Sequence, residues 1–276
     1  GADVFVENYK VGSLKKYGLD YDSLREINPQ LVYCSVTGFG QTGPYKDRAG
    51  YDYLIQGMGG LMSVTGERDD LPGGGPQRAG VAVADLLAGM YATTAILAAV
   101  QHRDRRHGGQ HIDISLLDCM VGSLVNQSMN YLVSGQVPQR MGSGHPNIAP
   151  YAVYPAADGH LVLAVGNDTQ FRRLCEAVGQ AGVGTDSRFA TIADRVRNRA
   201  ELDAWLVPVT RSRSLADWTS LLERAQVPGG PINRMDQVFA DEQVVARGLR
   251  AELRHPRYGR VPTVRNPMRF SATPLE

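Results

Sequence analysis

The chain has 276 residues, of which 43% are hydrophobic, and a formal net charge of +1 at pH 7. This length and composition allow a sizeable core in one or two domains, and the near-neutral charge disfavours a general nucleic-acid binder, which would be strongly basic. Cys34, Cys119 and Cys175 form no CxxC pair. We therefore expect buried free thiols, a reducing compartment and no metal site.

The first part of the chain predicts a parallel α/β unit. Buried strands are expected at DVFVEN (3–8) and QLVYCSV (30–36), with a short helix at YDSLREIN (21–28) between them. After a glycine-rich stretch, a long helix is predicted to begin near Asp85 and to end at the basic HRDRRHGGQ. HIDIS is a further short strand, and Ser115 with Asp118 indicates a capping box that opens another apolar helix.

The second part of the chain changes to α+β character. YAVYPAADGHLVLAV predicts a hairpin that turns at Asp158-Gly159. Helices are expected near 194–211 and 214–226, the second capped by Ser214, and LRAELRHPRYGRVPTV predicts a final hairpin. The sequence thus divides into four parts: a large α/β domain at 1–133, a linker with a glycine-rich loop at 134–150, a small α+β domain at 151–247, and at 248–276 a hairpin that returns toward the large domain.

No run of eighteen apolar residues occurs, so we predict no membrane span. The nearest candidate, LLAGMYATTAILAAV (86–100), is closed by charged residues, and we interpret it as a buried core helix. The chain begins at Gly1 without a methionine, so the lack of a targeting peptide is uninformative. A cytoplasmic location is expected, with a mitochondrial one left open.

Two local patterns suggest ligand binding, each with a plainer alternative. Residues 38–43, GFGQTG, match the letters of a dinucleotide fingerprint, but Pro44 and loop-like residues follow where a helix must open, which disfavours NAD. All four lysines, Lys10, Lys15, Lys16 and Lys46, fall within the first 46 residues. They indicate either a local site for an anion such as a phosphate or chance clustering in an arginine-rich composition.

One carboxylate, Asp85, stands in the apolar run GVAVADLLAGMYA (80–92). A charged side chain is rarely buried without a partner. Asp85 is therefore either a first-turn residue that the helix dipole favours, or a nucleophile that the same helix terminus keeps ionised. The two interpretations are compatible.

Several blocks in order carry a family resemblance: DVFVENY, INPQLVYCSVTGFGQTGPY, AGYDYLIQGMGGLMSVTG, GVAVADLLAGMYA and GGQHIDISLLD. Over essentially its whole length the chain resembles the class III CoA-transferases, the family of formyl-CoA and carnitine CoA-transferases. The resemblance implies a Rossmann-like large domain, a smaller α+β domain and an interlocked homodimer. The family's opening and closing segments are not matched, so the resemblance implies a fragment that is inactive and aggregates or dimerises alone.

The resemblance also implies which residues form the site. Asp85 is expected to attack an acyl-CoA thioester, giving a mixed anhydride and then an aspartyl-CoA thioester, inside a dry pocket that protects both intermediates. Coenzyme A is then a substrate, and no cofactor is bound permanently. The positions that match the CoA site of the family are Asn8, Tyr9, Ser13, Lys16, Arg48, Tyr51 and Asp52. Gly142, Ser143, Gly144 and His145 match the loop that closes over the thioester, and a flexible linker is the alternative.

Three functions remain open at this point. Motifs such as VPGGPINRMDQVF look closest to enzymes that move CoA between dicarboxylic acids such as succinate, glutarate or hydroxymethylglutarate; Arg48, Arg78 and Arg140 are candidates for the second carboxylate. A racemase of the same fold is disfavoured, because Tyr51 stands where that branch has a histidine, and tyrosine, with an ordinary pKa of about 10, is a poor base. The third possibility is a CoA-binding module without turnover. No nucleic acid or membrane partner is expected.

Overall fold

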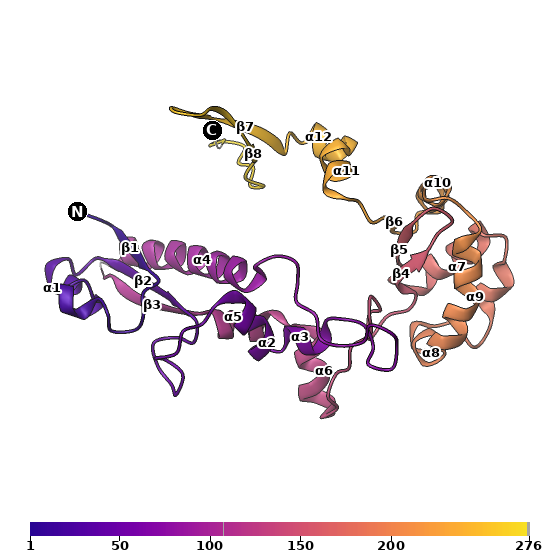
Figure 1. Ribbon diagram of the computed structural model, residues 1–276, viewed down its shortest axis with the longest axis horizontal. Helices are drawn as coiled ribbons and strands as arrows, with labels where there is room; N and C mark the ends of the chain where they lie inside the picture. Colours follow the sequence, from indigo (N-terminus) through magenta and orange to yellow (C-terminus); the bar gives the residue numbers. More distant parts are fainter. Residues whose placement is uncertain (107, 275–276) are drawn as a thin grey trace. The chain divides into compact units, whose positions relative to one another are not determined.

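The computed structural model describes residues 1–106 and 108–274 (Figure 1). The chain divides into two compact units, an N-terminal unit of residues 1–143 and a C-terminal unit of residues 144–276. The division falls within the stretch 134–150, for which the sequence predicts a linker. Each unit has its own sheet and its own hydrophobic core, and each is described separately below.

The N-terminal unit contains a parallel three-stranded sheet in the order β1-β2-β3. Its strands are β1 (Val4–Glu7), β2 (Val32–Thr37) and β3 (Gln110–Ser115), and Val32 of the central strand pairs with Val4 and with Gln110. The parallel α/β prediction is confirmed. The prediction that both of the first two strands are buried holds only for β2, since β1 has one neighbouring strand and leaves Val6 56% exposed.

The helices of this unit lie between and after its strands. They are α1 (Tyr21–Ile27), α2 (Asp52–Met58), α3 (Leu61–Val64), α4 (Val83–Arg106), α5 (Leu116–Ser123) and α6 (Asn126–Ser134), with a 3-10 turn at Lys15–Tyr17. As predicted, Ser115 caps α5, and its hydroxyl accepts a hydrogen bond from the Asp118 N–H. A small core forms where α2, α4 and α5 meet, around Ile55, Ala88 and Met120.

Helix α4 is less buried than the sequence suggested. It packs on β2, β3, α2 and α5 through a stripe of alanines, Ala84, Ala88, Ala92 and Ala99, while Met90 and Leu97 are more than 60% exposed. The prediction of a buried core helix is therefore wrong, because most of the surface of α4 is exposed and only the alanine stripe is buried. By length and composition the stretch Val83–Arg105 could cross a membrane, and 22% of its most apolar window is buried here. A single helix that packs on a sheet through one stripe does not by itself indicate a span.

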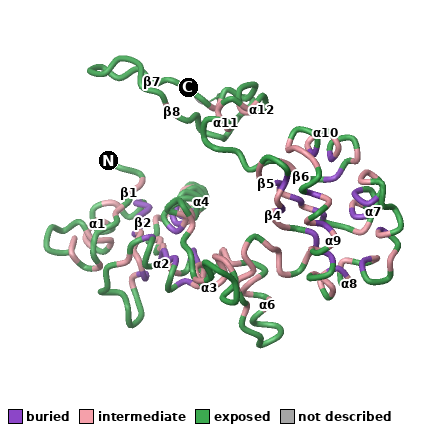
Figure 2. Tube along the Cα trace, turned by 45° about the vertical axis from the view of Figure 1, so that its right-hand side comes forward, coloured by how far each residue is buried: buried purple, intermediate pink, exposed green. Residues whose placement is uncertain are grey.

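The C-terminal unit begins with an antiparallel sheet of β4 (Tyr151–Pro155), β5 (His160–Ala164) and β6 (Gly229–Pro231). The predicted hairpin is confirmed, with Pro155 paired to His160 across the Asp158-Gly159 turn. Helices α7 (Asp168–Ala177), α8 (Ile192–Arg197), α9 (Arg199–Arg211) and α10 (Leu215–Ala225) surround it, with a 3-10 turn at Ala181–Thr185. Figure 2 shows buried positions gathered among these elements.

Two helix predictions in this unit need correction. The single helix predicted at 194–211 is two helices, because the backbone leaves the helical region at Asn198, which ends α8 and precedes α9. Helix α7 was not predicted, although Asn167 caps it by accepting from the Gln170 N–H. The prediction that Ser214 caps the next helix is confirmed by its hydrogen bond from the Asp217 N–H.

The core of the C-terminal unit is built from large side chains. Trp218, Phe171 and Leu206 are fully buried, and the indole of Trp218 donates to the carbonyl of Thr210 at 2.9 Å. Beyond this core the chain forms α11 (Met235–Ala240), α12 (Glu242–Ala246) and the predicted final hairpin, β7 (Arg250–His255) with β8 (Gly259–Val264). The hairpin is largely exposed (Figure 2).

Candidate active site

A cavity of about 930 Å³ opens in the N-terminal unit at the carboxyl ends of the parallel strands. The segment 6–11, at and beyond the end of β1, forms one wall, and the segment 36–38, at the end of β2, forms another. The loop Lys46–Tyr51, the first turns of α4 and Leu116, just after β3, complete the lining. Open α/β sheets bind ligands at this edge, because strand ends and helix starts converge there.

Close backbone contact shapes one side of this cavity. Gly38 and Gly50 approach so closely that a Cβ added to Gly38 would lie 2.4 Å from the Gly50 Cα, which only glycine allows. No helix opens after Gly43; turns continue until α2 begins at Asp52. The backbone geometry therefore agrees with the interpretation that residues 38–43 are a ligand-approaching loop without a dinucleotide fingerprint.

Asp85 lies in the first turn of α4 and borders the cavity. Partial burial raises the pKa of this carboxyl, and the negative charge of Asp52 raises it further. A carboxylate with a raised pKa is a more basic nucleophile once it is ionised. The described residues do not enclose Asp85 in the dry apolar pocket that was expected, because Asp85 is exposed and charged side chains line the cavity beside Ala88 and Leu116.

Three cations line the same cavity: Lys10, Lys46 and Arg48. Within residues 1–106 and 108–274 none of them forms an ion pair, and the Arg48 guanidinium lies 4.0 Å from the centre of the Tyr45 ring. Glu7 and Asp47 also reach the lining, so the wall has both signs of charge. Unpaired ammonium and guanidinium groups beside an open cavity suit a phosphate or carboxylate ligand.

The structure brings together most, but not all, of the residues that the resemblance assigns to the site. Asn8, Tyr9, Arg48 and Tyr51 share the cavity wall with Asp85. The residues that do not line it are Ser13, Lys16 and Asp52. The Ser13 hydroxyl is buried without a hydrogen-bond partner among the described residues, and the Lys16 ammonium lies 4.8 Å from the Tyr17 ring centre.

Two lysines that line the cavity, Lys10 and Lys46, are absent from the residues that the resemblance assigns to the site, which include only Lys16 of the four lysines. The signal that could have found them is their position directly after a predicted strand and in the loop after the next one. In a parallel sheet these two segments meet at one edge.

The three arginines that could bind a second carboxylate of the substrate differ in whether another side chain already occupies the guanidinium. Arg140 is engaged in the N-terminal unit, since it pairs with Asp69 and donates to the Ser63 carbonyl. Arg78 is exposed and lies 5.7 Å from the Tyr53 ring centre. Of the three candidates, Arg48 alone lines the cavity with Asp85.

The glycine-rich loop spans the division between the units. In the N-terminal unit, Gly142 has a positive φ of 58° and its N–H donates to the Gly66 carbonyl. Ser143 ends that unit, and Gly144 begins the next. In the C-terminal unit the backbone N–H of His145 donates to Tyr151, and burial together with the charge of Arg199 lowers the pKa of the His145 imidazole.

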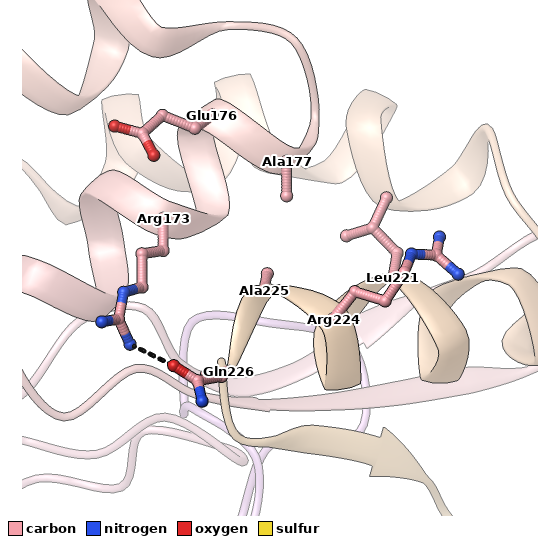
Figure 3. Close-up of a pocket in the computed structure, with 7 residues that line it drawn as sticks. All are labelled: Arg173, Glu176, Ala177, Leu221, Arg224, Ala225 and Gln226. Atoms are coloured by element: carbon pink, nitrogen blue, oxygen red, sulfur yellow. Dashed lines mark hydrogen bonds between the residues drawn. The ribbon is translucent and has the colours of Figure 1, made fainter.

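A second, smaller cavity of about 510 Å³ lies in the C-terminal unit between α7 and α10 (Figure 3). Ala177, Leu221 and Ala225 form its apolar surface, and Arg173 donates to the side chain of Gln226 at 3.2 Å. It lies between two helix surfaces rather than at the end of a parallel sheet. The geometry therefore favours the larger cavity as the reactive site. Among the described residues, no cluster of His, Cys, Asp and Glu could hold a metal ion.

Comparison with known proteins gives a consistent result. The sequence profile of CoA-transferase family III matches residues 1–276. The succinate–glutarate CoA-transferase of Agrobacterium fabrum is 53% identical over 274 residues, which are 99% of this chain and 68% of that protein. The human succinyl-CoA:glutarate CoA-transferase is 39% identical over 269 residues, 98% of this chain and 60% of that protein. The chain thus spans about three fifths to two thirds of the length of these relatives.

A solved structure gives the same fold. The crystal structure of a CAIB/BAIF family protein from Brucella suis superposes with a TM-score of 0.83 at 51% sequence identity. The match covers 100% of this chain and 70% of that one. A likeness of this extent and identity fixes the fold and the family together.

Proposed function

This chain belongs to CoA-transferase family III, and we propose that it moves CoA from an acyl-CoA to a carboxylic acid with Asp85 as the nucleophile. The observation that carries the proposal is the placement of Asp85. It is a carboxylate in the first turn of α4, beside a 930 Å³ cavity that also presents unpaired cations. A cavity of this size suits a large anionic substrate such as a CoA thioester.

The proposed reaction consists of two acyl exchanges on the Asp85 carboxyl. An Asp85 oxygen attacks the thioester carbonyl carbon, the C–S bond breaks, and the CoA thiolate leaves a mixed anhydride behind. The thiolate then attacks the Asp85 carbonyl carbon and releases the donor acid, which leaves an aspartyl-CoA thioester. The acceptor carboxylate attacks this thioester, and the same steps in reverse yield the new acyl-CoA and free Asp85. No net oxidation occurs, and no further reactant is consumed.

Dicarboxylic acids are the proposed acyl groups. The relatives named above act, by their names, on succinate and glutarate. A second carboxylate needs a cation, and Arg48 lines the cavity without a carboxylate partner in the described residues. Lys10 and Lys46, which line the same cavity, suit the phosphates of CoA. These charges support an anionic acyl donor over a purely apolar one.

A homodimer in the cytoplasm is the proposed working state. Exposed apolar side chains on α4 and α6, such as Met90 and Leu132, favour burial against a second copy. All three cysteines are free and buried, which suits a reducing compartment. Sedimentation of the purified protein tests the assembly, and a monomer at micromolar concentration would contradict it.

Covalent trapping tests the function. The protein is incubated with succinyl-CoA, reduced with borohydride or cleaved with hydroxylamine, and mapped by mass spectrometry. We expect modification of Asp85 alone, and the same modification of Asp85 in the matched control Asp47→Asn, whose carboxylate lines the same cavity. A racemase or a binding module forms no covalent adduct, so an unmodified Asp85 after turnover with succinyl-CoA would overturn the proposed mechanism.

A further inference from the structure

Helix α2 buries two polar side chains one turn apart. Asp52 is 9% exposed and Gln56 is fully buried, and the Gln56 Nε2 donates to the Asp52 Oδ2 at 2.7 Å. Buried polar groups are costly unless every hydrogen-bonding atom finds a partner. The remaining atoms of this pair do find partners, and all of these lie in one other segment of the chain.

That segment leads directly into α4. The Gln56 Oε1 accepts from the Ala79 N–H at 2.9 Å, and its Nε2 also donates to the Val81 carbonyl at 3.2 Å. The Asp52 Oδ1 accepts from the Ala84 N–H at 2.8 Å. Two side chains of α2 thus hold three backbone groups in residues 79–84, the stretch immediately before Asp85.

We propose that Asp52 and Gln56 are positioning residues that fix the start of α4 and thereby aim the Asp85 carboxylate into the cavity. The inference rests on the proposed role of Asp85 as nucleophile. Neither residue touches the cavity, so the effect passes through the backbone of residues 79–84. Displacing a reacting group by about 1 Å lowers rates on the order of a hundredfold. Hydrogen bonds that hold the backbone of residue 84, next to the nucleophile, are therefore expected to raise the rate of transfer.

The charge of Asp52 adds a second effect. A neutral or apolar pair could fill the same space, and a buried charge is not needed for stability alone. Its negative charge raises the pKa of Asp85. Other charged groups line the cavity with Asp85, namely Glu7, Lys10, Lys46, Asp47 and Arg48. They are unchanged in the variants proposed below, so their effect on the ionisation of Asp85 is the same in those variants as in the wild type.

The first test is Gln56→Met, which keeps the volume of the side chain and removes its three hydrogen bonds. We expect kcat for transfer to fall about 10- to 100-fold while KM for the acyl-CoA changes less than about twofold, because only the aim of Asp85 is lost. The matched control is Gln101→Met, an exposed glutamine on α4 whose change leaves both constants near the wild-type values. Equal kcat in the Gln56 variant and the control would overturn the positioning role.

The second test separates charge from packing. In Asp52→Asn the acid limb of the kcat/KM profile is expected to move to lower pH, since the neighbouring negative charge is gone and Asp85 ionises more readily. The double variant Asp52→Asn with Gln56→Glu restores the hydrogen bond between the two side chains and the buried negative charge, although the Val81 carbonyl loses its donor. Its acid limb should therefore return toward the wild-type pH. An acid limb that does not move in Asp52→Asn would remove the electrostatic part of the proposal.

Trapping distinguishes this inference from the proposed function. If wild-type protein forms no borohydride-sensitive adduct at Asp85, the nucleophile assignment itself fails. If the wild type is labelled at Asp85 and folded Gln56→Met is labelled at the same rate, the nucleophile stands and the positioning role alone is wrong. Circular dichroism at the assay temperature establishes that each variant is folded.

Discussion

The two units of this chain differ in how completely they bury and satisfy their side chains. The C-terminal unit packs Trp218, Phe171 and several leucines at zero exposure, and it buries Arg195 with each of its three guanidinium nitrogens in a hydrogen bond. The N-terminal unit has a smaller core around Ile55, Leu116 and Met120, to which α4 contributes only alanines, Ala84 and Ala88. It also contains all the buried side-chain atoms without a partner among the described residues, on Ser13, Gln41, Gln127 and Arg140.

This difference indicates where rigidity and reactivity reside. Buried polar atoms without a partner cost stability, and proteins retain them chiefly where a ligand or partner will use them. The cavity with Asp85, Lys46 and Arg48 lies in the unit that has these features. The C-terminal unit, in contrast, has the larger and better packed core, between Ala149 and Val227. Each prediction below tests one side of this contrast.

The largest effect is expected in the N-terminal unit, from Asp85→Asn. An amide cannot form the anhydride, so transfer from succinyl-CoA should fall at least about 10³-fold, as removal of a covalent nucleophile usually does. The fold should be intact, because Asp85 is exposed and forms no hydrogen bond through its side chain that the described residues reveal. Steady-state assays together with circular dichroism check this. Full activity in the folded variant would show that the N-terminal unit does not hold the reactive carboxylate at Asp85.

Core truncation should be most costly in the C-terminal unit. Leu206 is fully buried, so Leu206→Ala is expected to lower the free energy of unfolding by about 3 kcal/mol. The control Leu97→Ala removes a side chain that is 65% exposed and should change stability by less than about 0.5 kcal/mol. Urea denaturation measures both. Equal losses would show that the exposed face of α4 is covered in solution.

Removing the buried guanidinium tests the polar part of the same core. Arg195 donates to the carbonyls of Ala149 and Phe189 and pairs with Asp168 at 2.8 Å. Arg195→Met leaves two carbonyls without donors and should cost about 2 to 3 kcal/mol. Arg188→Met, which breaks ion pairs of a half-exposed side chain and a contact with the Phe189 ring, should lower the melting temperature much less. A similar drop in melting temperature for both variants would contradict the special role of the buried group.

A smaller effect is expected for substrate binding in the N-terminal unit. Lys46 lines the cavity and Lys16 does not, so Lys46→Ala should weaken acyl-CoA binding roughly tenfold at low salt, with a smaller loss at high salt. Lys16→Ala is the matched control. Titration calorimetry at two salt concentrations compares them, and a larger loss for the Lys16 variant would restore the assignment that the family resemblance suggested.

The smallest effect is a trade of stability for reactivity at Asp85. The pKa of Asp85 is raised in the folded chain, so folding favours the protonated carboxyl over the ionised one. This contribution to the free energy of unfolding is complete at pH values below the pKa of the unfolded chain, and it is lost as the pH rises through the pKa of the folded chain. Ionised Asp85 therefore weakens the fold slightly at neutral pH. Asp85→Asn should melt slightly above the wild type at pH 7, and the gap should close in acid. Thermal scans across pH check the sign of this difference.

Local chemistry in the sequence determined many elements of the fold. The Asp158-Gly159 turn set the register of its hairpin, and the Ser115 and Ser214 hydroxyls marked the starts of α5 and α10. Asp85 was correctly expected in a first turn. These features depend on residues within a few positions of one another, so a single sequence is enough to predict them. The break at Asn198 was missed because no proline or glycine marks it. Helix α7 was missed although Gly166 and Asn167 stand before its start and Gly179 follows its end.

Tertiary structure alone decided what surrounds Asp85. Lys10 and Lys46 reach one cavity because the ends of β1 and β2 meet at one edge of the sheet. The exposed face of α4 depends on which elements pack against the helix, and its apolar composition does not report that. The Asp52–Gln56 pair is visible in the sequence only as two polar residues one turn apart. Its partners, Ala79, Val81 and Ala84, lie 23 to 32 positions further along the chain, and only folding brings them together.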